Sequence, residues 1–141
     1  MKKSAVIYWS GTGNTEAMAN AVLEGMKEGE AEVQLLTPEQ VNDAVISEME
    51  ALAFGCPAMG AEALEEDEFE PMFSSCKDKL AGKNVALFGS YGWGDGEWMR
   101  SWEEDCAQAG ISLSCESVTC CEEPNEAILA ACRSLGRALV Q

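Results

Sequence analysis

The stretch Ala5-Val6-Ile7-Tyr8-Trp9-Ser10-Gly11-Thr12-Gly13-Asn14-Thr15-Glu16 decides the fold of this chain. Its first five residues form a continuous apolar run, which predicts a strand buried on both faces. The following residues are rich in glycine and hydroxyl side chains, and residues 16–26 then carry apolar side chains at helical spacing. The stretch therefore predicts a buried strand, a tight loop and a helix.

The loop at residues 10–15 has the composition of a phosphate-binding loop. Its glycines let backbone N–H groups turn toward an anion, its hydroxyl groups can donate hydrogen bonds, and a helix N-terminus adds partial positive charge. A Walker loop would need Gly-Lys-Ser/Thr, and a dinucleotide fingerprint would need a third glycine where Glu16 stands. An ordinary helix cap by Ser10 or Thr12, without a ligand, is the alternative. The hydroxyl-rich context favours a monophosphate held by neutral donors.

The rest of the chain alternates between strand and helix patterns. Short apolar runs predict further strands at 33–36, 51–56, 85–89 and within 111–121, and helical spacing predicts further helices at 67–80, 97–108 and from Pro124-Asn125 onward. Five strands separated by helices imply a parallel sheet with helices on both faces. Ligands of such sheets bind beyond the carboxyl ends of the strands. We therefore expect function in the loops after the first, third and fourth strands.

Composition narrows the possible functions. The 141 residues, 47% of them hydrophobic, are enough for one domain with its own core. The 25 acidic residues against 9 Lys and Arg give a net charge of −16, which argues against nucleic-acid binding and indicates a basic protein partner. The chain has no histidine. Histidine-dependent catalytic triads, His-ligated zinc and haem attachment are therefore excluded.

The cysteines indicate a reducing compartment. Their number, seven, is odd, they form no C-x-x-C motif, and no signal segment precedes the first strand, so we expect a cytoplasmic protein without a metal site. Most should be small core side chains, and the adjacent pair Cys120-Cys121 is the candidate for oxidation. No apolar run approaches the roughly 20 residues of a membrane span, so no membrane association is expected.

Three segments together resemble a known family. The stretch from Tyr8 to Glu16 resembles the phosphate loop of flavodoxins, the small FMN-binding electron carriers, and in particular their short-chain clostridial type. Gly55-Cys56-Pro57-Ala58-Met59-Gly60 and Leu87-Phe88-Gly89-Ser90-Tyr91-Gly92-Trp93-Gly94-Asp95-Gly96 agree with it in order and spacing. The resemblance implies one flavodoxin-like domain over residues 1–141, a three-layer α/β sandwich whose five-stranded parallel sheet has the order 2-1-3-4-5.

The same resemblance implies a function. The implied function is that of a low-potential one-electron carrier that binds FMN non-covalently. No enzymatic activity is implied, because the cofactor performs the redox chemistry. We expect a monomer that exchanges electrons with basic redox proteins such as reductases and oxidoreductases. The expected FMN-binding residues are Ser10, Gly11, Thr12, Gly13, Asn14, Thr15, Ala58, Met59, Gly60, Ala61, Glu62, Ser90, Tyr91, Gly92 and Trp93.

Two side chains have the chemical character to pack against a flat aromatic ligand, whatever the family. Met59 is polarizable and Trp93 is a broad plane, although Met59 could equally fill a gap and Trp93 could cap the surface. The resemblance implies that they cover opposite faces of the isoalloxazine ring, with Gly60 opposite flavin N5 and Glu62 near the pyrimidine edge. A Gly60 carbonyl that rotates to accept a hydrogen bond from N5–H needs the positive φ that glycine allows.

Several positions depart from the family pattern or fall outside its site. Ala61 offers no side-chain acceptor and tolerates positive φ less well than the Asn or Asp that relatives often have. The segment Cys120-Cys121-Glu122 lacks the asparagine that relatives often place near the flavin, so no binding role is predicted there. Trp98 and Trp102, four residues apart, should be core or groove residues rather than stacking residues.

Acidic residues gather around the proposed ring site. Six lie within nine residues, Glu62, Glu65, Glu66, Asp67, Glu68 and Glu70, and Asp95 and Glu97 follow Trp93. They would disfavour an anionic reduced flavin, or they form a solvated face that serves solubility.

The sequence also bears on three other functions. An FMN-dependent quinone or NAD(P)H reductase on the same fold is the alternative, although 141 residues leave little chain for a lid. A phosphoacceptor receiver domain lacks its acidic pair, because Trp9-Ser10 stand in that place. A binding module without redox function remains, and the pairing of Met59 with Trp93 argues against it.

Overall fold

A computed structural model describes residues 2–11, 13–59, 63–92 and 94–141. Its strands are β1 (Lys3–Tyr8), β2 (Glu32–Leu36), β3 (Ala51–Gly55), β4 (Asn84–Tyr91) and β5 (Val118–Cys121). Its helices are α1 (Asn14–Glu28), α2 (Asp43–Glu48), α3 (Phe69–Cys76), α4 (Glu97–Gln108) and α5 (Glu126–Leu139), with short 3-10 turns at Pro38–Gln40 and Lys77–Lys79. Strands and helices therefore alternate, as the sequence predicts.

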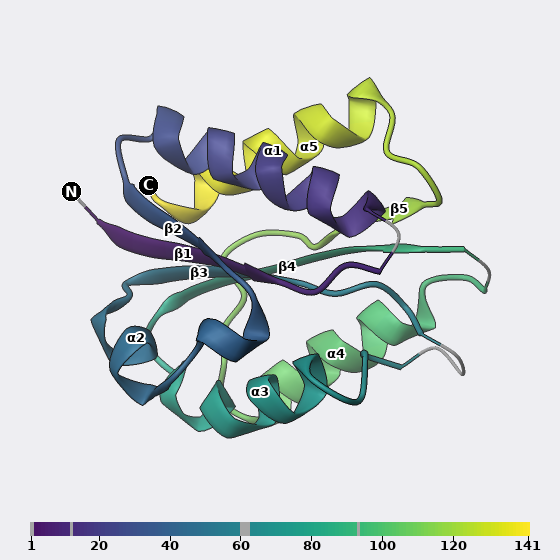
Figure 1. The fold of residues 1–141 in the computed structure, drawn as a ribbon. Helices are drawn as coiled ribbons and strands as arrows, with labels where there is room; N and C mark the ends of the chain where they lie inside the picture. The colour runs from purple at the N-terminus through teal and green to yellow at the C-terminus, as the bar shows by residue number, and fades with distance from the viewer. Residues whose placement is uncertain (1, 12, 60–62, 93) are drawn as a thin grey trace.

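The strands form one parallel sheet in the order β2-β1-β3-β4-β5, which confirms the predicted order. Figure 1 shows three layers, with α1 and α5 covering one face of the sheet and α2, α3 and α4 covering the other. The register pairs Tyr8 with Gly55, Gly55 with Phe88, and Tyr91 with Cys121. The carboxyl ends of β1, β3, β4 and β5 therefore meet at one edge of the sheet.

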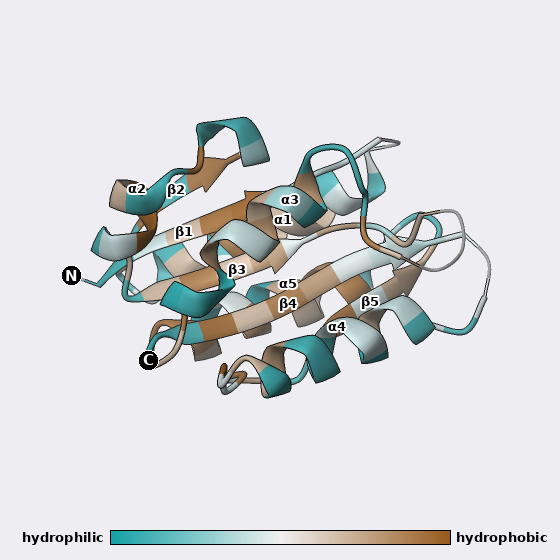
Figure 2. Ribbon diagram, turned by 90° about the horizontal axis from the view of Figure 1, so that it is seen from below, coloured by the Kyte–Doolittle hydropathy of each residue, from teal (hydrophilic) through white to brown (hydrophobic). Residues whose placement is uncertain are grey.

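The central strands are apolar because both of their faces are buried (Figure 2). Alternate side chains enter different cores: Ile7 and Phe54 pack toward α3 and α4, while Val6 and Ala53 pack toward α1 and α5. This two-sided burial explains the continuous apolar runs in the sequence.

The two tryptophans of α4 belong to the first of these cores. Trp98 is 1% exposed and Trp102 is 2% exposed, which confirms that they are core residues. The Trp102 ring makes edge-to-face contacts with Phe69 and Phe73 at centroid distances of 5.5 and 5.6 Å.

Helices α1 and α5 approach each other at two glycines. A Cβ added to Gly25 would lie 2.9 Å from the Cα atom of Arg133, and one added to Gly136 would lie 2.9 Å from the backbone nitrogen of Met26. Both contacts are with backbone, which has little room to move. The pair of glycines therefore sets how closely these helices pack against each other.

Most cysteines are core residues, as predicted. Cys56, Cys76, Cys106, Cys120 and Cys132 are buried, Cys115 is half-buried and Cys121 is exposed. Burial raises the pKa of Cys56, Cys106 and Cys132 to about 12. These three thiols therefore remain protonated and unreactive at neutral pH.

The structure departs from the predicted elements in three places. Residues 38–48, for which the sequence predicts no structure, contain a 3-10 turn and the six-residue helix α2. The helix predicted at 67–80 is shorter, because α3 covers only Phe69–Cys76 and a 3-10 turn follows it. The strand predicted within 111–121 occupies only its last four residues. Within the described ranges, no helix is both long and apolar enough to span a membrane, and no cluster of three or more His, Cys, Asp or Glu side chains could bind a metal.

Candidate functional site

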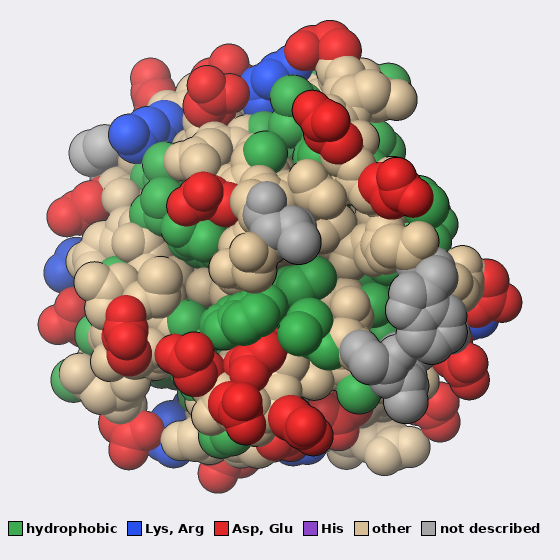
Figure 3. Space-filling model, turned by 45° about the vertical axis from the view of Figure 1, so that its right-hand side comes forward, with side chains coloured by type: hydrophobic (Ala, Val, Ile, Leu, Met, Phe, Trp, Pro, Cys, Tyr) green, Lys and Arg blue, Asp and Glu red, His purple; other side chains and the backbone are tan. Residues whose placement is uncertain are grey.

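The candidate site lies at the edge of the sheet where the carboxyl ends of the strands meet. Figure 3 turns this edge toward the viewer and shows hydrophobic side chains gathered near the centre of the face, with Asp and Glu side chains around them. Lys and Arg side chains are few on this face. An apolar centre inside an acidic rim is therefore the main feature of the region.

The loop between β1 and α1 is organised by one hydroxyl group. The Ser10 Oγ atom accepts hydrogen bonds from the backbone N–H of Gly13 (3.1 Å) and of Glu16 (3.3 Å). Gly13, at the start of α1, has a φ of 96°, a left-handed conformation that glycine adopts without strain. The N-cap residue is Gly13, not Ser10 as in the alternative of an ordinary helix cap, and Thr12 lies outside the described residues. Ser10 thus orients the loop while its own O–H remains a donor.

A buried pair of hydroxyl groups joins this loop to the sheet. The side-chain oxygens of Thr15 and Ser90 lie 2.8 Å apart, and both residues are almost fully buried. Thr15 belongs to the first turn of α1 and Ser90 to the end of β4, so the bond joins two segments of the predicted site that are 75 residues apart. It fixes the first turn of α1 against the end of β4.

Thr15→Val is expected to destabilise the protein by about 1–2 kcal/mol, because the valine keeps the shape of threonine but leaves the Ser90 hydroxyl buried without a partner. Urea unfolding of the single variants and of the double variant with Ser90→Ala measures the coupling, expected to be about 1 kcal/mol. Strictly additive effects of the two substitutions would show that the hydroxyl pair contributes nothing.

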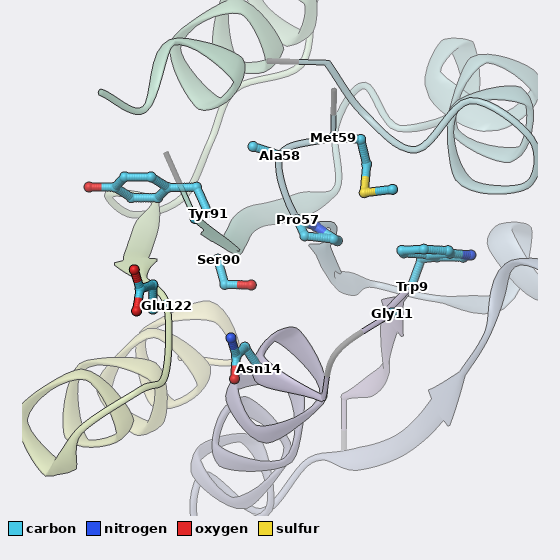
Figure 4. A pocket seen from close by; sticks show the side chains of 10 residues that line it. Trp9, Gly11, Asn14, Pro57, Ala58, Met59, Ser90, Tyr91 and Glu122 are labelled. Carbon is cyan, nitrogen blue, oxygen red and sulfur yellow. The ribbon is translucent and has the colours of Figure 1, made fainter. Parts of the chain in front are cut away.

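An apolar hollow of about 220 Å³ lies between the loops after β1, β3 and β4 (Figure 4). It is lined by Trp9, Gly11, Asn14, Pro57, Ala58, Met59, Ser90, Tyr91, Gly92 and Glu122. Met59 is 38% exposed. An exposed apolar side chain of this size beside a hollow is typical of a ligand-binding site. Trp9 packs over Gly11, where an added Cβ would lie 3.2 Å from the indole ring. The apolar hollow therefore has the Met59 thioether and the Trp9 ring in its wall, and it adjoins the phosphate-type loop at Gly11.

Backbone hydrogen bonds hold the rims of the apolar hollow together. Ala58 N–H donates to the Ser90 carbonyl (2.9 Å), and Glu122 N–H donates to the Tyr91 carbonyl (2.6 Å). Met59 and Ala63 exchange two N–H to carbonyl bonds of 2.8 and 3.1 Å. The segments after β3 and β5 are thus each tied to the end of β4.

The structure brings most of the predicted residues to this region. The residues that line the apolar hollow are Gly11, Asn14, Ala58, Met59, Ser90, Tyr91 and Gly92. Ser10 and Gly13 lie in the adjoining loop, and the Thr15 hydroxyl contacts that of Ser90. The predicted positions of Thr12, Gly60, Ala61, Glu62 and Trp93 lie outside the described residues.

Three lining residues were not among the predicted site residues: Trp9, Pro57 and Glu122. Trp9 and Pro57 lie within two residues of the ends of β1 and β3, so the rule that carboxyl ends converge could have identified them. Glu122 follows β5 and has a φ of 62°, which is uncommon for glutamate. Its position beside Asn14 and Tyr91 depends on how the edge strand ends (Figure 4).

One acid of the predicted cluster has a different function. Glu65 is only 5% exposed, and its carboxylate accepts bonds of 2.8 Å from the backbone N–H of Asp67, Glu68 and Phe69. It is therefore neither a solvated charge nor part of a surface rim, which corrects the expectation for this residue. Burial acts to raise its pKa, but the three N–H bonds outweigh burial and the pKa is lowered. Glu65 caps the start of α3 and fixes the turn formed by residues 65–69.

Glu65→Gln is expected to cost about 2 kcal/mol at neutral pH, since an amide replaces a charged acceptor and turns a donor toward a backbone N–H. Because the folded pKa is lowered, the stabilisation by Glu65 is complete above the ordinary carboxyl pKa of 4.5 and is lost as pH falls below it through the folded value. Urea unfolding at several pH values should show the difference between wild type and variant shrinking on acidification. A difference that does not change with pH would contradict this assignment.

The donor set of the region fits a flavin monophosphate. The loop at the start of α1 offers a hydroxyl group, left-handed glycine backbone and a helix N-terminus to a phosphate, while the apolar hollow offers Met59 and Trp9 to a flat ring. Fold and site together define a doubly wound, nucleotide-binding α/β protein.

Comparison with known proteins gives the family. The flavodoxin family model matches residues 6–136. The chain is 42% identical to the flavodoxin of Megasphaera elsdenii over 133 residues (94% of this chain, 95% of the relative) and 45% identical to that of Clostridium beijerinckii over 122 residues (86% and 88%). The solution structure of the two-electron reduced Megasphaera elsdenii flavodoxin superposes with a TM-score of 0.89 at 41% identity, covering 97% of this chain and 98% of the other. The chain belongs to the flavodoxin family and is of its short-chain type.

Membership of this family decides the class of activity. The protein is an FMN-binding electron carrier and not an enzyme, and the comparisons do not favour the alternative of a quinone or NAD(P)H reductase. Flavodoxins pass electrons to redox partner proteins.

Proposed function

We propose that residues 1–141 form a single FMN-binding domain that carries one electron at a time at low potential. The observation that carries this proposal is the convergence of the loops after β1, β3 and β4 on one apolar hollow that opens onto a phosphate-type loop. The proposed FMN-binding residues are Ser10, Gly11, Thr12, Gly13, Asn14, Thr15, Ala58, Met59, Gly60, Ala61, Glu62, Ser90, Tyr91, Gly92 and Trp93. Bound FMN supplies the group that accepts and donates electrons.

The chain contributes binding, orientation and charge. Ser10 and the start of α1 hold the phosphate, which anchors the ring end in the apolar hollow. Trp9, Met59 and Tyr91 exclude water from the ring, so that electrons leave by its exposed edge. None of these residues has to exchange a proton with a substrate, which agrees with a chain that has no histidine.

Carboxylates near the apolar hollow make an anionic reduced cofactor less favourable. Glu122 lines the hollow, and Glu66, Asp67 and Glu68 are exposed on the segment that follows Met59 and Ala63. At roughly 10 Å in water each carboxylate costs about 0.4 kcal/mol before salt screening, on the order of 20 mV for one electron. Several such charges support the proposal of a low potential.

The direct test is the visible spectrum of the purified protein and its titration with dithionite. We expect a yellow protein with flavin absorption bands that is reduced in two separate one-electron stages and does not oxidise NADH or NADPH by itself. Colourless protein that fails to take up added FMN would reject the proposal. Rapid NADH oxidation with a quinone would instead favour the reductase function.

We infer that the protein is a cytoplasmic monomer whose redox partners, reductases or oxidoreductases, carry basic docking surfaces. The net charge of −16 and the acidic rim of the site support this choice of partner (Figure 3). Electron transfer to a basic reductase should become about tenfold slower as ionic strength rises from roughly 20 to 300 mM, because screening weakens the attraction. Stopped-flow kinetics measures this rate, and a rate indifferent to salt would show that the charge serves only solubility.

A further inference from the structure

A groove of about 410 Å³ lies on the face of the sheet that α3 and α4 cover, between α4 and the segment that leads into α3 (Figure 1). Its lining residues are Ala63, Leu64, Glu66, Glu70, Trp98, Ser101, Trp102 and Asp105. The four that belong to α4 are spaced i, i+3, i+4 and i+7, so they form one stripe along the helix. We call this space the α3–α4 groove.

The floor of the α3–α4 groove is apolar. Trp98 and Trp102 are buried core residues, and Leu64 is half-buried against the same core. The indole N–H of Trp102 is also buried and has no hydrogen-bond partner among the described residues. Buried donors in folded proteins are almost always paired. An acceptor brought by a bound group would therefore complete the hydrogen bonding of this ring.

The rim of the groove carries negative charge on both sides. Glu66 and Glu70 are exposed on the side of α3, and Asp105 is half-buried on α4. Lys77 pairs with Asp105 at 2.9 Å, whereas neither glutamate forms a salt bridge with a described residue. The groove therefore combines an apolar floor with a rim that attracts cations.

The groove adjoins the apolar hollow of the candidate site. Ala63, which lines the groove, exchanges two backbone hydrogen bonds with Met59, which lines the hollow. The ring centroid of Trp98, in the groove, lies 5.3 Å from that of Tyr91, in the hollow. A molecule that occupies the groove is therefore next to the place proposed for the flavin ring.

The size of the groove fits one part of a protein partner. A space of about 410 Å³ holds only a few groups of side-chain size, whereas a specific protein interface involves roughly 20–30 residues on each side. Binding energy at such interfaces is concentrated in a few side chains that enter well-formed pockets. The groove is therefore suited to anchor one partner side chain inside a larger contact.

We propose that the α3–α4 groove is a docking site for a redox partner, and that it accepts an apolar side chain with Lys or Arg beside it on the partner's surface. The apolar side chain contacts Leu64, Trp98 and Trp102, and the cation pairs with Glu66 or Glu70. The proposal rests on the proposed exchange of electrons with basic partners. It places the anchoring contact outside the cofactor site, since none of the lining residues is among the proposed FMN-binding residues.

The test uses the full chain supplied with FMN and isotope-labelled at its indole nitrogens. Two synthetic peptides represent the partner's surface, one with a leucine between two pairs of lysines and one with glycine in place of the leucine. NMR titration measures both dissociation constants and shows which indole N–H signals move. The leucine peptide should bind about fivefold more tightly, because its leucine is partly buried in the groove. It should move the signals of Trp98 and Trp102 more than that of Trp9.

Ser101→Arg is the variant that closes the groove. Ser101 is exposed on the groove stripe of α4, so an arginine there adds bulk and a cation without entering the core. The matched control is Ala107→Arg, which adds the same side chain at an exposed position of the same helix, outside the groove. Ser101→Arg should weaken binding of the leucine peptide by at least about tenfold, and the control by less than about threefold. Urea unfolding checks that both variants remain folded.

Equal affinity for the two peptides, or indole signals of Trp98 and Trp102 that do not move, would overturn the inference. A dimer in sedimentation experiments that Ser101→Arg dissociates would also overturn it, because a second copy of the chain would then occupy the groove. Protein that takes up no FMN would reject the proposed function instead. The peptide titration needs no electron transfer, so it decides the binding chemistry of the groove in either case.

Discussion

Gly25→Ala is expected to lower the free energy of unfolding by about 3 kcal/mol, although alanine favours helices by about 1 kcal/mol over glycine. The added methyl group would overlap the backbone of Arg133, where α5 crosses α1. Backbone atoms cannot rotate away as a side chain can, so the two helices would have to separate. The separation would also loosen the contacts of Val22 and Met26, both fully buried in the core beneath.

Urea unfolding followed by circular dichroism measures this loss. Gly136→Ala, on the facing helix, should cost a similar amount, since its added carbon would meet the backbone of α1. Ala17→Gly, at an exposed position of the same helix α1, isolates the intrinsic preference and should cost only about 1 kcal/mol. Gly25→Ala protein as stable as wild type would mean that α1 and α5 do not pack this closely.

The close crossing of α1 and α5 illustrates the part of the fold that could not be predicted from the sequence. The strands at β1, β3 and β4 are predictable because burial on both faces leaves a continuous apolar run. Gly25 lies inside a predicted helix without any local sign that another backbone touches it. That contact exists only after five strands and their crossovers have placed the two helices side by side on the sheet (Figure 1).

Helix α2 was not predicted, and strand β5 was predicted only within a longer range, for a different reason. Helix α2 has six residues and buries only Ile46, so it shows no apolar stripe, and its start depends on the Asn42 side chain accepting the Val45 N–H. Strand β5 lies at the sheet edge and buries only Cys120. Elements that bury one side chain leave too little pattern to be found or to be placed exactly.

The candidate site was predictable where backbone topology alone creates it. Parallel strands bring the loops after β1, β3 and β4 together whatever their side chains, so Met59, Ser90 and Tyr91 could be located in advance. The burial of Glu65 could not, because its sequence neighbours are exposed acids and only the backbone turn before α3 encloses it. The sequence therefore predicts where the site lies better than it predicts the charge within it.

The prediction with the largest effect on binding concerns the phosphate of FMN. The loop offers it the Ser10 hydroxyl and the N-terminus of α1, and each hydrogen bond to a charged group contributes about 1.5–3 kcal/mol. Two such bonds correspond to at least about 100-fold in affinity. Riboflavin, which lacks the phosphate, should therefore bind at least about 100-fold more weakly than FMN.

Ser10→Ala should remove much of that difference. The variant loses one donor to the phosphate, and the N–H groups of Gly13 and Glu16 lose the acceptor that orients them, so FMN affinity should fall by about 30- to 100-fold. Riboflavin affinity should change less than threefold, because Ser10 does not line the apolar hollow. Titration of the flavin-free protein with both flavins measures this, and Ser112→Ala, at an exposed serine before β5, is the matched control. An equal loss of affinity for both flavins would show that Ser10 only maintains the fold of the loop, and that the phosphate is held elsewhere.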